Sequence, residues 1–280
     1  MALSLMYITN NLQVAKIAQQ YGVERIWIDL ETLGKEERQK GFDTVKSHHS
    51  VADILAIKPH LTTSKMMVRV NPWNNGSREE IDDVVAAGAD IIMLPYWKTV
   101  NEVEQFIDAV GKRSKTVLLL ETKEAVDCLD SILEIDGVDE IHIGLNDLHL
   151  SYGLDFMFEL LTNGVVERLC EKIKKKQIPY GFGGIARIGD GAVPAEKIIM
   201  EHYRLGSTRA ILSRSFCDYT KIDDLERVEE LFSKNMRLLR EFEVYASNAG
   251  KEVFEQNKYE LSIAVNTIVN AIRKKNTGEG

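Results

Sequence analysis

Four ionisable side chains stand at the ends of sequence stretches that otherwise read as buried β-strands. Glu31 follows IWIDL, Arg69 lies in MMVRVN, Glu121 closes TVLLLE, and Asp147 follows IHIGLN. Two carboxylates that end neighbouring strands would repel each other unless a cation lies between them. Mg²⁺ or Mn²⁺ suits such oxygen ligands and keeps positions open for water and substrate. Glu121 and Asp147 are therefore predicted to hold Mg²⁺ or Mn²⁺, with another divalent cation as the alternative.

The histidines bear on the identity of the metal and on the group that moves protons. None of the six forms an H-x-x-x-H or H-x-H pair, which disfavours a Zn²⁺ site. His48 and His49, in KSHHSVAD, are candidates for proton transfer. The same segment also fits the start of a helix capped by Ser47 or Ser50, with both histidines exposed.

The acids at the strand ends have a purely structural interpretation as well. An acid in such a place can serve the start of the next helix, and the sequence around Glu121 and Thr122 fits a helix start. Four ionisable residues on one side of the strands nevertheless favour an active site over helix capping.

Short β-branched or apolar runs alternate along the chain with longer segments of helical period, which is typical of parallel strands joined by helices. Eight strands are predicted, at 3–8, 24–30, 65–71, 90–95, 116–121, 140–145, 179–184 and 208–213. SREE, at 77–80, has the pattern of a capping box. Eight such units predict an α/β protein with a single (β/α)8 TIM barrel, and a doubly wound open sheet is the competing fold.

The barrel pattern is complete near residue 215, so residues 1–216 are predicted to form a catalytic barrel domain. Residues 217–280 are a C-terminal helical extension, with long helices expected at about 221–248 and 250–274. This extension is expected to belong to the same domain or to lie at the interface of a homo-oligomer.

Composition narrows the classes of partner. The 280 residues include 43 acidic and 35 basic side chains, a formal charge of −8, which disfavours nucleic acid and anionic membranes. The sequence has no uninterrupted apolar run of about 18 residues and no signal-peptide pattern in MALSLMYITNN. The three cysteines lie far apart, without metal-type spacing. A soluble, cytoplasmic protein with reduced thiols is expected.

Five motifs carry a family resemblance. They are IWIDLE (26–31), VRVN (68–71), GADIIMLP (88–95), LLLET (118–122) and GVDEIHIGLNDLHLSYG (137–153), in that order along much of the predicted barrel. As a set they resemble the HpcH/HpaI aldolase and citrate lyase β-subunit family of phosphoenolpyruvate/pyruvate-type barrels. The resemblance implies a metal-dependent aldolase or lyase that acts on pyruvate or another 2-oxo acid with an aldehyde or acyl partner. A homo-oligomer, as a trimer or hexamer, is expected.

The resemblance also implies roles for individual residues. The metal held by Glu121 and Asp147 would act as a Lewis acid that stabilises an enolate, and Arg69 would donate to the developing oxyanion. The expected catalytic residues are Arg69, Glu31 and His48. The expected substrate-binding residues are Arg69, Pro95, Gly144, Leu145, Asn146 and Asp147, the last four through backbone N–H groups around the substrate carboxylate.

Two positions depart from the family pattern. Thr32 stands where the aldolases have a histidine and the lyases have the second acid of D-L-E-D. Tyr96 stands where a lysine often follows the proline of the fourth strand. The general base therefore remains open among His48, His49, metal-bound water and a group of the substrate.

Three other functions remain alternatives. A citrate-lyase-like acyl or acyl-CoA lyase would use the same enolate. A phosphoenolpyruvate-type transferase or mutase would need a phosphate pocket, for which GFGGIARIG (181–189) is the candidate. A catalytically silent barrel that binds a 2-oxo acid is the non-enzymatic alternative, motivated by the missing histidine and lysine.

Overall fold

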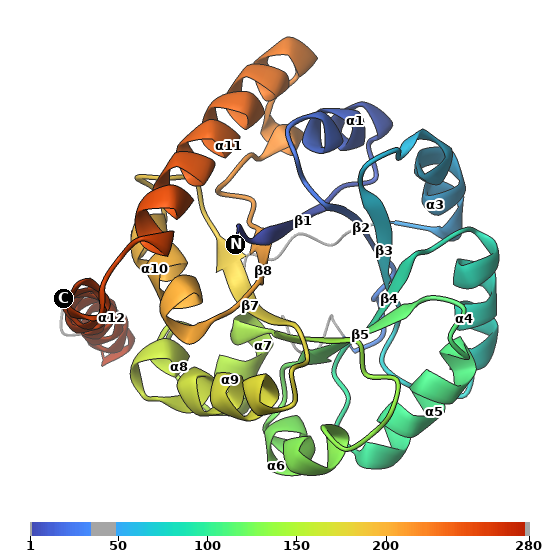
Figure 1. Cartoon of the computed structure of the whole chain (residues 1–280), viewed down its shortest axis with the longest axis horizontal. Helices are drawn as coiled ribbons and strands as arrows, with labels where there is room; N and C mark the ends of the chain where they lie inside the picture. The colour runs from blue at the N-terminus through green and yellow to red at the C-terminus, as the bar shows by residue number, and fades with distance from the viewer. Residues whose placement is uncertain (1, 35–48, 278–280) are drawn as a thin grey trace.

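Eight parallel strands form a closed barrel at the centre of the computed structural model (Figure 1), which describes residues 2–34 and 49–277. The strands are β1 (Ser4–Ile8), β2 (Arg25–Asp29), β3 (Lys65–Arg69), β4 (Ile91–Leu94), β5 (Lys115–Leu120), β6 (Glu140–Ile143), β7 (Tyr180–Ile185) and β8 (Arg209–Leu212). They pair in sequence order, and Ser4 pairs with Arg209 to close the ring. The predicted (β/α)8 barrel is confirmed, and the open sheet is wrong.

Helices surround the barrel, and capping side chains fix where several of them begin. They are α1 (Leu12–Gln20), α3 (Val51–Ile57), α4 (Ser77–Ala86), α5 (Val100–Val110), α6 (Lys123–Ile132), α7 (Leu145–Ser151), α8 (Glu159–Thr162), α9 (Val165–Lys175), α10 (Ala195–Leu205), α11 (Leu225–Ser247) and α12 (Lys251–Thr277). Short 3-10 helices span Lys58–His60 and Tyr219–Lys221. Asn11 caps α1, and Thr99 forms a capping box with Glu102 at α5. The capping box predicted for SREE is wrong, because Gly76 precedes α4 and Glu80 instead accepts hydrogen bonds from Asn71.

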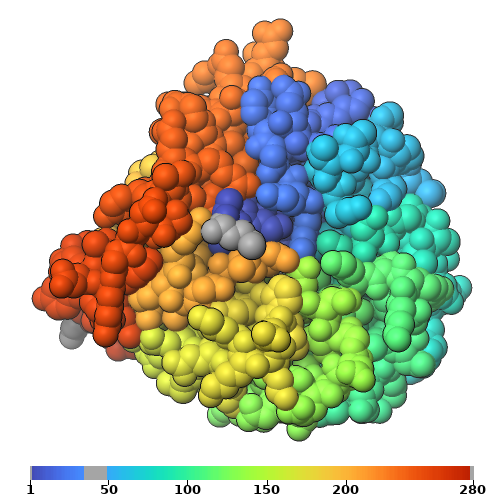
Figure 2. Space-filling model, viewed as in Figure 1, coloured from blue at the N-terminus to red at the C-terminus, as the bar shows by residue number. Residues whose placement is uncertain are grey.

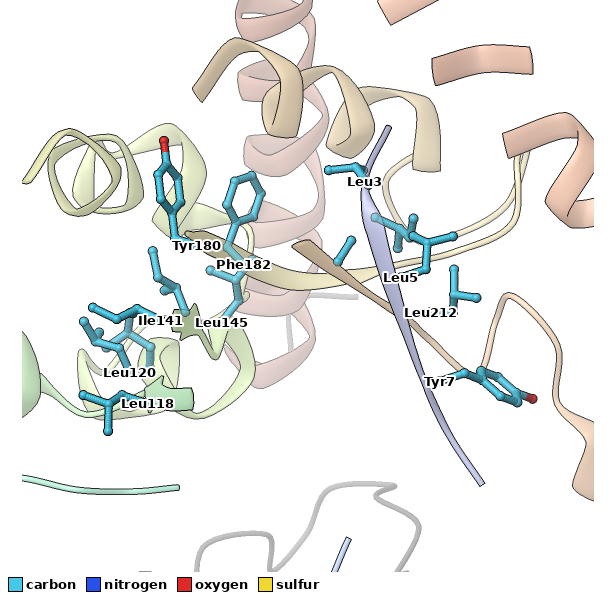
Figure 3. Packing of buried hydrophobic residues seen from close by; sticks show 14 of the residues in the cluster. Leu3, Leu5, Tyr7, Leu118, Leu120, Ile141, Leu145, Tyr180, Phe182 and Leu212 are labelled. Carbon is cyan, nitrogen blue, oxygen red and sulfur yellow. The ribbon is translucent and has the colours of Figure 1, made fainter. Parts of the chain in front are cut away.

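Side chains alternate between the inside and the outside of the barrel along each strand, as the two-residue period of a strand requires. Those that point outward join the core between barrel and helices, where Figure 3 shows Leu118, Leu120 and Ile141 near Leu145 of α7. Those that point inward form a separate apolar cluster of Met6, Trp27, Met67, Ile91, Met93, Val117 and Leu119. This inner cluster fills the middle of the barrel, so inward polar side chains gather at its two ends.

A buried ion-pair network lies at the end where the strands begin. Glu140 of β6 accepts hydrogen bonds from Arg25 of β2 at 2.7 Å through each oxygen, and from Nε of Arg209 of β8 at 3.1 Å. Because β2, β6 and β8 are not neighbours in the ring, these bonds cross the barrel interior. Burial opposes ionisation, but the hydrogen bonds and charges of Arg25 and Arg209 lower the pKa of Glu140 below its ordinary value.

The two long C-terminal helices pack on one flank of the barrel (Figures 1 and 2). Their buried faces carry Val228, Phe232, Met236, Leu239, Leu261, Val265 and Val269. Glu243 of α11 accepts the N–H of Leu3 at 2.7 Å, so this helix also holds the start of the first strand. Both predicted helices are present, while their place at an oligomer interface stays a prediction. Within residues 2–34 and 49–277, no helix has both the length and the apolar character that a membrane span needs.

Two buried histidines are held in the neutral form. His142 follows Glu140 on the inner face, and its Nε2 lies 3.2 Å from the carbonyl oxygen of Gly183. His202 of α10 stacks on Phe182, with ring centroids 3.9 Å apart. One ring nitrogen of each histidine has no hydrogen-bond partner among the described residues. Burial lowers the pKa of His142 to about 4 and that of His202 to about 3.

We predict that His202 makes the protein less stable in mild acid. An unfolded histidine binds a proton below about pH 6.5, whereas the buried ring stays neutral, so protons favour the unfolded chain. This histidine's contribution is complete above that pH, and the free energy of unfolding should fall by about 1.4 kcal/mol per pH unit below it. Urea unfolding at several pH values should give a shallower slope for His202→Gln. The exposed control His60→Gln should match the wild type. Equal slopes in all three proteins would contradict the prediction.

Candidate active site

The end of β3 carries an arginine that two carboxylates clamp. Arg69 donates from Nε and Nη2 to the two oxygens of Asp29, at 2.8 Å each, and its Nη1 lies 3.1 Å from Oε2 of Glu31. The guanidinium carbon lies 5.2 Å from the centre of the Trp27 ring. Asp29 and Arg69 are register partners in the β2–β3 pairing, so both point into the barrel. Such two-pronged pairing fixes the plane of the guanidinium.

The same carboxylates fix the charge of Arg69. Burial alone would lower its pKa, but the negative charges of Asp29, Glu31 and Glu121 raise it above the ordinary value. A guanidinium has five N–H groups, and the pairs with Asp29 and Glu31 engage three of them. Among the residues that the structure describes, these pairs leave two N–H groups of Arg69 unengaged.

Glu121 follows β5 on the inner face of the barrel. It lies two residues after Leu119 and four after Val117, so its side chain points to the same inner side as theirs, and only 4% of its surface is exposed. The next helix is capped by Thr122, whose hydroxyl accepts the N–H of Ala125 at 3.1 Å. Capping is therefore the role of Thr122, and the carboxylate of Glu121 lies at the barrel mouth.

The loop after β4 holds one oxygen of Glu121. The N–H of Tyr96 donates to Oε1 of Glu121 at 3.0 Å. Tyr96 has a φ of 50°, in the left-handed region that residues other than glycine rarely adopt. Pro95, a predicted substrate-binding residue, lies buried directly before it. The strained backbone at the end of β4 thus directs an N–H group at the carboxylate.

The other oxygen of Glu121 faces the start of α7. A Cβ added to Gly144 would lie 2.8 Å from Oε2 of Glu121, so only glycine fits there. Gly144 is the N-cap of α7, and the half-buried Asp147 lies in the first turn of that helix. Asn146 is exposed and its side-chain amide donates to Oδ1 of Asp147 at 3.2 Å. Leu145 is buried. Glu121 thus adjoins the turn that carries Asp147.

These carboxylates match the donor set of a hard divalent cation. Mg²⁺ is commonly bound by one or two carboxylates together with water and substrate oxygens. Glu121 offers a buried oxygen beside Gly144, and Asp147 offers a second carboxylate on the adjoining turn. No group of three or more His, Cys, Asp or Glu side chains is placed to hold a metal among the residues that the structure describes. The fit is therefore to a two-carboxylate site with open positions.

His49 lies beside the arginine clamp. Its Nδ1 accepts the N–H of Asp29 at 3.0 Å, and the residue is half-buried. Because Nδ1 accepts, the neutral ring carries its proton on Nε2. Ser50 donates to Asp53 at the start of α3, so the predicted helix start is confirmed, but His49 is not simply exposed. His48, the predicted catalytic histidine, lies outside the described residues.

Asn71 ties the segment after β2 to the end of β3. Its Oδ1 accepts the N–H of Thr32 at 2.9 Å, the hydroxyl of Thr32 at 3.2 Å and the N–H of Leu33 at 3.0 Å. The amide of Asn71 donates in turn to Glu80, whose pKa burial raises. The Thr32 hydroxyl is therefore engaged as a donor to Asn71.

The glycines after position 180 let one barrel strand pack closely against neighbouring elements. GFGG lies within β7, and a Cβ on Gly181 would collide with the carbonyl of Arg209 on β8. A Cβ on Gly183 would lie 2.7 Å from a side-chain atom of Leu145. These glycines permit close approach of neighbouring elements, which explains GFGG without a ligand, while phosphate binding by the rest of GFGGIARIG, in the loop after β7, stays a prediction.

Sequence analysis assigned no role to Asp29 or Asn71, although both contact residues of the candidate site. Asp29 carried a signal, because it is charged and ends a buried strand two positions before Glu31. Asn71 carried none beyond its place after the third strand, since asparagine is common in turns.

Comparison with known proteins gives a family and several structural neighbours. The model for the HpcH/HpaI aldolase/citrate lyase family matches residues 3–157, more than half of the chain. An HpcH/HpaI aldolase from Desulfitobacterium hafniense DCB-2 is 14% identical, with a TM-score of 0.57 over 86% of this chain and 93% of that chain. An HpcH/HpaI aldolase/citrate lyase family protein from Burkholderia cenocepacia J2315 is 15% identical, with a TM-score of 0.60 over 81% and 95%. Tryptophan synthase from M. tuberculosis is 14% identical, with a TM-score of 0.58 over 85% and 93%. No curated protein matches the sequence.

The solved structures are only 14–15% identical to this chain, so they show the fold alone. The family match, in contrast, extends over the residues of the candidate site. That match runs from β1 past α7, and it therefore includes Asp29, Arg69, Glu121 and Asp147. The chain belongs to the HpcH/HpaI aldolase/citrate lyase family.

Proposed function

We propose that this protein is a divalent-metal-dependent aldolase or lyase that breaks or forms a C–C bond through the enolate of pyruvate or a related 2-oxo acid. The observation that carries the proposal is the placement of a permanently charged Arg69 and the buried carboxylate of Glu121 at one mouth of the barrel. Membership in a family of aldolases and lyases supports the same class of reaction.

Glu121 and Asp147 would hold Mg²⁺ or Mn²⁺, which when bound supplies a Lewis acid to the oxygens of the 2-oxo acid. The bond from the Tyr96 N–H orients the Glu121 carboxylate before any ligand arrives. Gly144 leaves open the space beside the other oxygen of that carboxylate, which a larger residue would fill.

Arg69 would stabilise the negative charge that develops on the carbonyl oxygen of the substrate as the C–C bond breaks. Its two remaining N–H groups are available for this, and Asp29 and Glu31 hold the guanidinium so that it need not reorganise. Glu31, predicted to be catalytic, would act in this account by positioning Arg69.

The substrate carboxylate would lie at the first turn of α7. The N–H groups of Leu145, Asn146 and Asp147 have no acceptor within the helix, as at every helix start. Pro95 and Leu145 are both buried and would bound the apolar side of the substrate.

Cleavage of a hydroxy 2-oxo acid needs a base for the hydroxyl proton and a donor that protonates the enolate carbon. His49 would serve as a hydrogen-bond donor through Nε2, because its Nδ1 is engaged by the N–H of Asp29. The base would then be His48, a water molecule or a group of the substrate.

A citrate-lyase-like acyl or acyl-CoA lyase is the second candidate, favoured by the inclusion of citrate lyase in the family description. It would use the same Arg69 and carboxylates, and it is distinguished by cleavage of 3-hydroxyacyl thioesters in place of hydroxy 2-oxo acids. A phosphoenolpyruvate-type transferase or mutase stays an alternative, and its phosphate pocket would use the loop after β7, because GFGG itself lies within the strand.

We predict that Glu121→Gln binds Mn²⁺ at least about tenfold more weakly than the wild type, because an amide oxygen carries no charge for the cation. Calorimetric titration of the metal-free protein measures this. The exposed Glu124→Gln, three residues away, removes the same charge and should bind Mn²⁺ like the wild type. Absence of Mn²⁺ binding by the wild type, or equal binding by Glu121→Gln, would contradict the assignment.

We predict that the wild type with Mg²⁺ or Mn²⁺ exchanges the methyl protons of pyruvate for deuterium, and that Arg69→Lys lowers this rate by about 10²–10³-fold. A lysine keeps the positive charge but lacks the planar guanidinium that Asp29 and Glu31 hold in place. Mn²⁺ binding should persist in Arg69→Lys, and Arg78→Lys, at an exposed position, should exchange normally. Normal exchange in Arg69→Lys would remove this residue from the mechanism. No exchange in the wild type would exclude the pyruvate reaction.

A further inference from the structure

The last helix of the chain, α12, lies at the outer edge of the molecule, beyond α10 (Figures 1 and 2). One side of it packs against α8 and α10 and buries Leu261, Val265 and Val269. Residues three or four positions apart share one side of a helix. On the side opposite the buried one, the exposed residues include Gln256, Tyr259, Ile263, Thr267 and Asn270, which we call the outer stripe.

The outer stripe is uncharged, unlike the exposed side of the preceding helix. From position 261 to position 272 the sequence has no Asp, Glu, Lys or Arg. The two largest side chains of the stripe, Tyr259 and Ile263, are 64% and 50% exposed. On α11, by contrast, exposed positions carry the charged residues Arg227, Glu230, Lys234, Arg237 and Glu241. Depletion of charge around an exposed tyrosine and isoleucine is typical of a protein–protein contact and not of a solvated helix face.

The exposed side of α12 is arranged symmetrically about Ile263. In both directions from this residue, exposed positions lie four, seven and eleven residues away, namely Tyr259 and Thr267, then Gln256 and Asn270, then Glu252 and Lys274. A two-fold axis at Ile263 that relates two antiparallel copies of the helix would therefore set each of these positions against its counterpart in the other copy.

The two ends of α12 carry opposite charges that this arrangement would bring together. Glu252 lies in the first turn and Lys274 in the last. Among the described residues, neither the carboxylate of Glu252 nor the ammonium group of Lys274 has a hydrogen-bond or ion-pair partner. Antiparallel pairing places each of them opposite its counter-charge in the other copy, whereas parallel pairing would oppose like charges at both ends. The charges therefore favour the antiparallel arrangement.

We propose that the outer stripe of α12 binds the same stripe of a second copy of this chain, antiparallel and with Ile263 on the two-fold axis. The same surface then serves both subunits, as a two-fold contact requires. Such a contact gives a dimer or a larger assembly with an even number of subunits, which fits a hexamer and excludes a trimer. It is independent of the metal and of the enolate chemistry proposed for the barrel mouth.

Sedimentation velocity of the full chain over a range of concentrations tests the proposal. We expect the wild type to sediment as a dimer or a larger even-numbered assembly. Ile263→Glu should weaken the two-fold contact at least about tenfold, because it brings two carboxylates together at the axis. Glutamate favours a helix more than isoleucine does, so α12 should stay folded in this variant.

The matched control is Leu55→Glu, which changes an apolar residue of α3 that is 58% exposed and lies across the barrel from α12 (Figure 1). This control should assemble like the wild type. A wild type that is monomeric or trimeric at every concentration would overturn the proposal. Wild-type assembly by Ile263→Glu, or equal weakening by Leu55→Glu, would overturn it as well.

Cysteine cross-linking tests the position of the axis. Packed helices lie about 8–10 Å apart and each Cα lies about 2.3 Å from its helix axis, so facing Cα atoms would be roughly 5 Å apart, which a disulfide can span. Ile263→Cys should form a disulfide-linked dimer when oxidised by O₂ with a copper catalyst, as read on a non-reducing gel. Gln256→Cys, on the same stripe, would face Asn270 of the other copy and should not. Equal cross-linking of both variants, or none with Ile263→Cys, would overturn the proposal.

Discussion

Closure of eight parallel strands into a ring sorts the side chains of every strand into an inner and an outer set. The inner set has little space, and here its middle is filled by apolar residues such as Trp27, Met67 and Leu119. Charged inner residues are therefore confined to the two ends. Arg69 and Asp29 meet at the end where the strands finish, and Arg25 and Glu140 meet where they begin.

The clamp on Arg69 links the fold to the chemistry proposed for it. Its partners come from the neighbouring strand in fixed register, so the position of the guanidinium follows from the pairing of β2 with β3. Glu121 is placed by the same parity on β5, and the strained backbone at Tyr96 directs an N–H group at it. The site is thus built largely from strand ends, which a rigid barrel holds in place.

Local patterns predicted the strands and the charged residues that end them, because strand periodicity and burial act over a few residues. They did not predict which residues pair with them. The partnership of Asp29 with Arg69 depends on the register of two strands, and the bond between Asn71 and Thr32 depends on a loop. The reason for glycine at Gly181 could not be predicted either, since it comes from Arg209 on another strand. The predicted SREE capping box does not form, because Glu80 instead accepts a hydrogen bond from the side-chain amide of Asn71.

In the proposed reaction a metal and a 2-oxo acid bind at the same mouth of the barrel. Oxalate resembles the planar enolate of pyruvate, so its binding can be measured as a substitute for that of the enolate, without turnover. Equilibrium dialysis of labelled oxalate against the wild type should show binding with Mn²⁺ that is at least about tenfold tighter than without it, as expected when ligand and metal share charge. Oxalate binding that is equal with and without Mn²⁺, or absent under both conditions, would contradict the account.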